Sequence, residues 1–171
     1  AADEVNSLDE SDVKTACQTT LNKIEDAFEN VKTLDMSGKN SSQYAISTGA
    51  LVHFTGLTSL NLSGTGITEA GGLEDLTSLE SLDLSGNKGI DNTSFGALVG
   101  MSSLKELNLS GTGITDIGGL TGADGKGVAG TLTTLDISDT GVTKLESIWG
   151  AEEAGTPAFA ALKTLTAKNL A

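Results

Sequence analysis

LTSLNLSGTGI occupies residues 57–67 of this 171-residue chain, and LKELNLSGTGI occupies residues 104–114. LESLDLSGNKGI at 79–90 and LTTLDISDTGV at 132–142 repeat the same apolar positions, the former with one extra residue before its last isoleucine. Self-similarity of this kind at intervals of roughly 20 to 50 residues is the sequence sign of a repeat architecture. These four stretches therefore predict a repeat fold.

Two degenerate copies flank the four clear ones. The flanking copies keep only part of the apolar pattern, namely Val31, Leu34 and Met36 before it, and Leu162, Leu165, Ala167 and Leu170 after it. Measured from Met36 to Ala167 at the third apolar position, the steps between copies are 26, 22, 25, 28 and 30 residues. Because the strand positions must stay aligned, we expect the extra residues on the outer side of the coils, as in the Gly-rich stretch 122–130.

Each apolar triplet predicts a short strand whose inward side chains stack on those of the neighbouring coils. About six such coils would form one right-handed solenoid with a parallel sheet on its concave face. A polar column runs through the middle of the pattern, at Thr65, Asn87, Thr112 and Thr140. We expect these side chains to point inward and to bond backbone groups that a tight coil leaves unpaired, which is a structural role.

An amphipathic helix is predicted ahead of the repeats, from about Ser7 or Ser11 to Asn30. Its apolar positions recur at steps of four and three, at Val13, Cys17, Leu21, Ile24, Phe28 and Val31. The first coil of a solenoid exposes an apolar end, so we expect residues 1–30 to form a helical cap on a solenoid of residues 31–171. Partner binding by the helix is the alternative. Cys17, the only cysteine, would be a small buried apolar residue on the capping face.

The repeat, continued by Ile114-Thr115-Asp116-Ile117-Gly118-Gly119-Leu120, resembles bacterial leucine-rich-repeat proteins of the internalin type. The resemblance covers about residues 31 to 171. It implies a helical cap before the repeats, secretion or surface attachment, and binding of host proteins by the concave face. The family's coils are nearly uniform at 22 residues, and only one step here has that length.

The charge of the chain limits its partners. Its 23 acidic residues and 10 lysines, with no arginine, give a net charge of −13 that repels nucleic acid and anionic membranes. No apolar run is long enough to span a bilayer. We expect a monomer that is secreted or displayed at the cell surface, with a cytoplasmic location as the alternative, and a protein partner.

The predicted concave face is polar and acidic, and it has no aromatic residue. Alternation along the strands places one column of acids and amides there, with two further acids beside it. The candidate binding residues are Asp35, Asn61, Glu80, Asp83, Glu106, Asn108 and Asp136. A fully solvated surface without a ligand is the simpler interpretation, and recognition of a polar or basic partner is the functional one.

Catalysis is not expected, and neither a catalytic residue, a metal ligand set nor a cofactor is predicted. The single histidine, His53, lies in an apolar stretch without a second His or Cys at metal-ligand spacing. The alternatives to a protein-binding or adhesion module are a structural spacer or display segment, and a Ca²⁺-dependent or carbohydrate-binding module. The remaining aromatic residues are expected to fill the convex side, and they are Tyr44, Phe54, Phe95, Trp149 and Phe159.

Overall fold

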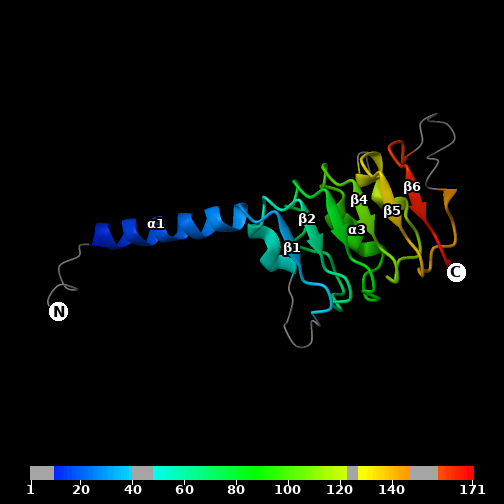
Figure 1. The fold of residues 1–171 in the computed structure, drawn as a ribbon, viewed down its shortest axis with the longest axis horizontal. Helices are drawn as coiled ribbons and strands as arrows, with labels where there is room; N and C mark the ends of the chain where they lie inside the picture. The colour runs from blue at the N-terminus through cyan, green and yellow to red at the C-terminus, as the bar shows by residue number, and fades with distance from the viewer. Residues whose placement is uncertain (1–9, 40–47, 123–126, 147–157) are drawn as a thin grey trace.

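The computed structural model describes residues 10–39, 48–122, 127–146 and 158–171. Within these residues six three-residue strands form one parallel sheet in sequence order, running along the molecule as seen in Figure 1. The strands are β1 (Thr33–Asp35), β2 (Ser59–Asn61), β3 (Ser81–Asp83), β4 (Glu106–Asn108), β5 (Thr134–Asp136) and β6 (Thr164–Thr166). The register aligns the central leucines of the six strands, so the predicted coils and their parallel sheet are confirmed.

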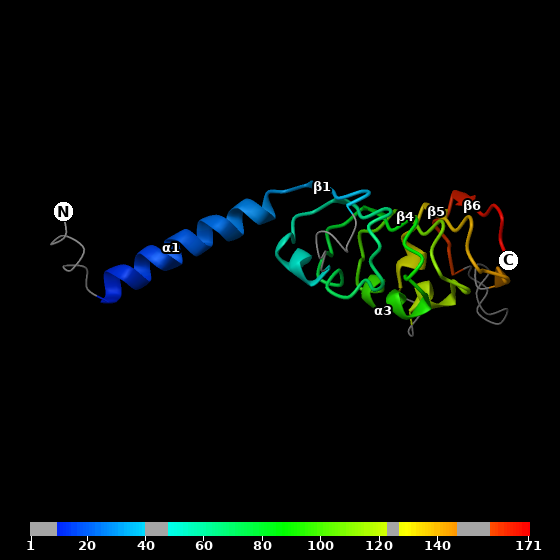
Figure 2. The same cartoon turned by 90° about the horizontal axis from the view of Figure 1, so that it is seen from below.

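Short helices return the chain on the side away from the sheet, which Figure 2 displays below the strands. They are η1 (Thr48–His53), η2 (Asn92–Ser94), α3 (Phe95–Leu98), η3 (Gly118–Thr121) and η4 (Val128–Gly130). The described connections between strands differ in length and in helix content, while all six strands keep three residues each. The sheet is therefore the regular surface of the molecule.

The core is a stack of leucines between the sheet and the return segments. Leu60, Leu82, Leu107 and Leu135 are at most 2% exposed, although each stands at the centre of a strand. The prediction that aromatic residues fill the outer side of the coils is confirmed for two of them, because Phe95 and Phe159 are 3% and 4% exposed. Phe54 is half-buried. Tyr44 and Trp149 lie outside the described residues.

The polar column inside the coils has the structural role predicted for it. Thr65, Thr112 and Thr140 donate their hydroxyl hydrogens to the carbonyl oxygens three residues earlier, at 2.7, 2.5 and 2.6 Å. Asn87 spans two coils, because its Nδ2 donates to the carbonyl oxygens of Leu84 and Leu62 at 2.8 and 2.9 Å. Its Oδ1 accepts from the backbone N–H of Gly66 at 2.8 Å. All four column residues are buried.

In each coil the residue three positions after the strand adopts the left-handed backbone conformation, and the chain turns there. Glycine fills this position after the first four strands, with φ between 61° and 71° at Gly38, Gly64, Gly86 and Gly111. Asp139 and Asn169 adopt φ of 57° and 50° after the last two strands. Asp and Asn are the side chains that best tolerate this conformation, so all six turns keep one geometry.

Helix α1 (Glu10–Glu29) precedes the sheet and extends away from the solenoid in both views (Figures 1 and 2). Its last turn reaches the first coil, where the Phe28 ring lies 4.8 Å from the ring of Phe54, between centroids. The prediction of a buried Cys17 is wrong, because this residue is exposed. The periodicity of a helix identifies its apolar face, but it does not supply a surface to cover that face. The division into a cap of 1–30 and a solenoid of 31–171 stays a prediction.

Candidate binding site on the sheet face

A ladder of alternating acids and amides crosses the exposed face of the sheet. The register pairs the third residue of each strand with the third residue of the next. This ladder, called the Asx ladder below, consists of Asp35, Asn61, Asp83, Asn108 and Asp136. The sheet therefore brings five of the seven candidate residues into one column. Adjacent strands lie about 4.8 Å apart, so two aspartates separated by one asparagine are about twice that distance apart.

Each ladder residue bonds its own turn. The Oδ1 atom accepts the backbone N–H two residues later, at 2.8 to 3.0 Å in all five coils. This Asx turn holds the side chain in one orientation and stabilises the chain as it leaves the strand. The role was missed at the sequence level, although the motif Asp/Asn-x-Ser recurs in all five coils from Asp35-Met36-Ser37 onward.

One amide links two rungs of the ladder. Asn108 donates from Nδ2 to Oδ2 of Asp83 at 3.3 Å, and its Oδ1 accepts from the N–H of Ser110. An asparagine between aspartates thus adds a hydrogen-bond donor where a third carboxylate would add repulsion. Because aspartates and asparagines alternate, the ladder is acidic but no two carboxylates are on neighbouring strands.

The hydrogen bonds at the N-terminal end of the ladder lower the pKa of Asp35 below its ordinary value of 3.8. The backbone N–H of Ser37 has the largest effect, followed by the Ser37 hydroxyl, since both stabilise the charged carboxylate. Asp35 is therefore ionised throughout the neutral range.

A shallow hollow of about 300 Å³ lies on the sheet face over β3, β4, β5 and the end of β6. Three carboxylates contribute to it, from Asp83, Glu106 and Asp136. The rest of its lining is Ser81, Leu82, Leu107, Asn108, Thr134 and Thr166. Asp35 and Asn61 lie on the earlier strands and do not line this hollow. Four of the candidate residues predicted from the sequence line the hollow, but the repeat pattern did not predict where along the ladder the face is recessed. They are Asp83, Glu106, Asn108 and Asp136.

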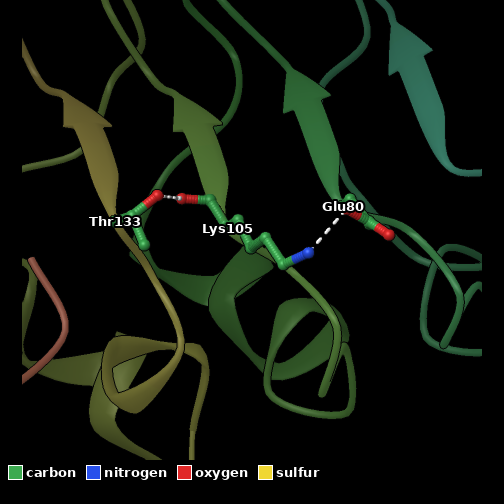
Figure 3. Close-up of polar contacts among 3 residues, drawn as sticks. All are labelled: Glu80, Lys105 and Thr133. Carbon is green, nitrogen blue, oxygen red and sulfur yellow. Dashed lines mark hydrogen bonds and ion pairs between the residues drawn. The ribbon is translucent and has the colours of Figure 1, made fainter.

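Glu80 does not line the hollow and instead forms an ion pair with Lys105. Its Oε2 accepts from Nζ of Lys105 at 2.7 Å, with the two side chains about half exposed (Figure 3). The carbonyl oxygen of Lys105 in turn accepts from the Thr133 hydroxyl at 3.1 Å. Glu80 was predicted to add charge to the middle of the ladder. In the structure the Lys105 ammonium group balances that charge, and the two residues directly precede β4 and β3.

A second hollow, of about 380 Å³, lies on the opposite side near η2 and α3. Glu69, Glu74 and Thr93 line it, together with Ser94, whose hydroxyl is buried and has no hydrogen-bond partner. Oε2 of Glu74 accepts a hydrogen bond from the backbone N–H of Gly72 at 2.6 Å. The Ser94 oxygen has almost no accessible surface, so a molecule in the hollow could not reach it.

The described residues offer no group of three or more His, Cys, Asp or Glu side chains arranged to hold a metal ion. His53 is exposed, and its ring lies 6.3 Å from that of Phe28, between centroids, in a stacked arrangement. None of the helices in the described part of the chain combines the length and apolar character that a bilayer crossing requires.

Two family models match the repeats. The model for leucine-rich repeats in two copies matches residues 55–98, and the model for a single leucine-rich repeat matches residues 100–121. No curated protein matches the chain. The matched stretches contain β2, β3 and β4, and of these β3 and β4 supply six of the nine residues that line the hollow.

Three solved structures resemble this chain. An internalin of Listeria monocytogenes, InlF, matches 72% of the chain with a TM-score of 0.59 at 21% sequence identity. The TLR13–ssRNA13 complex matches 70% of the chain with a TM-score of 0.51 at 25% identity. Internalin C2 of Listeria monocytogenes matches 84% with a TM-score of 0.45 at 17% identity, and it covers 84% of that internalin.

The match extends over 32% of InlF and 16% of TLR13, so this chain spans about a third of the first and less of the second. At 21% identity the likeness to InlF concerns the fold. Together with the repeat models it confirms the predicted solenoid.

Proposed function

This chain is a leucine-rich-repeat protein with a solenoid like that of the bacterial internalins, and from this premise we propose that it is a non-enzymatic binding module. Leucine-rich-repeat domains mediate protein interactions, so a protein partner is the general expectation. We further propose that the partner presents a basic segment, which binds in the acidic hollow over β3, β4, β5 and the end of β6. A secreted or cell-surface location, with a role in adhesion, belongs to the same proposal.

One observation carries the proposal: three carboxylates line the same recessed part of the sheet. Asp83, Glu106 and Asp136 line the hollow, and the nearby cation Lys105 is engaged by Glu80 at its edge. A lysine or arginine side chain from a partner would supply the missing positive charge. The chain's net charge of −13 would also steer a basic partner toward it.

The Asx turns favour binding because they fix the aspartates in advance. Oδ1 of Asp83 and of Asp136 accepts a backbone N–H at 2.8 Å, which restrains both side chains before any partner arrives. Prepositioned groups lose less conformational freedom on binding. The hollow has no aromatic lining, and aromatic residues and arginine supply most of the energy at tight interfaces. We therefore propose a salt-sensitive complex of moderate affinity.

The ladder itself supplies a gentle way to test this site. Asparagine already holds the Asx turn at Asn61 and Asn108, so Asp83→Asn and Asp136→Asn should keep the turns while removing charge. Combined with Glu106→Gln, they remove three charges from the hollow. A matched control, Glu69→Gln, Asp75→Asn and Glu146→Gln, removes three charges from exposed residues away from the sheet.

The experiment is a pull-down from extracts of host or neighbouring cell surfaces, with bound proteins identified by mass spectrometry. The unmodified chain and the control variant should retain the same partner. The hollow variant should lose at least about tenfold in affinity, which corresponds to about 1.4 kcal/mol. Retention by all three proteins would place the binding surface elsewhere, and capture by none would favour a structural spacer. A melting temperature that rises with Ca²⁺ and falls with a chelator would favour the calcium-dependent alternative.

A further inference from the structure

The aspartates of the Asx ladder recur at a fixed interval across the sheet. They stand on alternate strands, with Asp35 in β1, Asp83 in β3 and Asp136 in β5. Parallel strands lie about 4.8 Å apart, so consecutive aspartates are about 9.6 Å apart and the three together span about 19 Å. A basic segment whose charges recur at the same interval could pair with all three.

The regular backbone conformations differ in the interval at which side chains return to one face. In an extended strand every second residue does so, at about 6.7 Å. In an α-helix the intervals are about 5–6 Å for residues three or four apart and about 10.5 Å for residues seven apart. A polyproline II helix has three residues per turn, so every third residue returns to the same face at about 9.3 Å. Over two intervals it differs from the ladder by only about 0.6 Å, against about 1.8 Å for the α-helix.

We propose that the basic segment bound by this face is a polyproline II helix with lysine or arginine at every third position, lying across the strands along the Asx ladder. This inference rests on the proposed function, because it specifies the partner of the same site. Two of the cations would face Asp83 and Asp136, which line the hollow. A third cation, three residues further along the segment, would face Asp35 on β1.

The uncharged groups of the hollow also suit a polyproline II helix. Such a helix makes no internal hydrogen bonds, so its carbonyl oxygens accept bonds from other donors. The hydroxyl groups of Ser81, Thr134 and Thr166 line the hollow and can donate to them. An α-helix uses most of its carbonyl oxygens internally and gains less from these hydroxyls. None of the described residues that line the hollow is aromatic, so recognition depends on the spacing of charge rather than on packing of proline rings.

The test measures the binding of two synthetic peptides to the full chain at low salt by isothermal titration calorimetry. Both peptides have about nine residues, with three lysines and otherwise proline, so their length, charge and polyproline II conformation are the same. Lysine occupies every third position in one peptide and every second position in the other, where successive lysines point to different faces. The peptide with lysine at every third position should bind at least about fivefold more tightly, because it can form more than one ion pair with the ladder at once.

Two variants show whether the ladder causes this preference. Asp83→Asn combined with Asp136→Asn keeps the Asx turns, as the asparagines of the ladder do, and should abolish the preference, so that both peptides bind equally weakly. Glu69→Gln combined with Asp75→Asn is the matched control, because it removes the same charge from exposed residues away from the sheet. This control should bind the two peptides as the unmodified chain does.

Equal affinity of the two peptides for the unmodified chain would overturn the inference, and so would no binding of either peptide up to about 1 mM. A preference that survives in the Asp83→Asn, Asp136→Asn variant would also overturn it. The proposed function has a separate outcome. If the hollow variant loses its partner in the pull-down while the two peptides bind equally, the basic segment binds in another conformation. If the hollow variant retains its partner, the proposed site itself is wrong, whatever the peptides do.

Discussion

A leucine stands at the centre of the strand in both the central coils and the last coil, but its solvent exposure differs between them. Leu107 at the centre of β4 is 2% exposed, whereas its counterpart Leu165 in β6 is 37% exposed. Both occupy the aligned middle of a three-residue strand. They differ in the number of neighbouring coils, because Leu107 has one on each side and Leu165 pairs with β5 alone. In a solenoid, burial is a property of the stack as much as of the residue.

The largest expected effect tests this difference directly. Leu107→Ala should lower the free energy of unfolding by about 4 kcal/mol, because it removes a buried side chain and leaves a cavity. Leu165→Ala should lower it by less than about 1 kcal/mol, because that side chain is already partly hydrated. Urea unfolding followed by circular dichroism measures both. Similar losses in the two variants would mean that the last coil is covered in solution as well as the central ones are.

A somewhat smaller effect is expected from the polar column, where Asn87 joins two coils. Asn87→Ala should cost about 3 kcal/mol, because it removes the donor to the Leu84 carbonyl oxygen and both bonds that Asn87 makes to the neighbouring coil, at the Leu62 carbonyl oxygen and the Gly66 N–H. Asn87→Thr should cost only about 1 kcal/mol, because threonine at this position bonds its own coil elsewhere in the column.

Equal losses from Asn87→Ala and Asn87→Thr would show that the bonds between coils matter more than the bond within the coil. Urea unfolding of the two Asn87 variants distinguishes these outcomes. Thr112→Val is the control, because it removes only a hydrogen bond within one coil. Thr112 donates to Leu109 within its own coil.

The sequence was sufficient for the solenoid because its pattern follows from local geometry. The spacing of Leu57, Leu60 and Leu62 requires a strand, and the recurrence of that spacing requires that the strands stack in register. The inward role of Asn87 follows from the same reasoning, since a polar side chain at an apolar position must satisfy a backbone group.

The remaining features depend on what lies across from a residue, which the repeat pattern does not encode. Cys17 was predicted to be buried because it lies on an apolar face, but the structure leaves that face uncovered. Glu80 was grouped with the ladder because of its charge, and its ion pair with Lys105 depends on a residue 25 positions later. The position of the hollow follows from the stacking of four coils, β3 to β6, and no single repeat contains that arrangement.

The smallest predicted effect compares two aspartates whose pKa is lowered by different bonds. The carboxylate of Asp35 is stabilised first by the backbone N–H of Ser37, and that of Asp91 first by the Thr93 hydroxyl. Ser37→Ala should therefore raise the pKa of Asp35 only partway toward 3.8, whereas Thr93→Ala should raise the pKa of Asp91 further. Titration of the carboxyl carbons by NMR measures both values.

The two lowered pKa values also fix the direction of the pH dependence. A carboxyl group whose pKa is lower in the folded than in the unfolded chain stabilises the fold at pH values above the unfolded pKa. That contribution disappears as the pH falls through the folded pKa, so stability should decrease on acidification below about pH 4. The Ser37→Ala and Thr93→Ala variants should lose less of their remaining stability over that range, because their carboxyl groups gain less from folding. An identical acid dependence in the variants and the unmodified chain would mean that these two turns do not contribute to it.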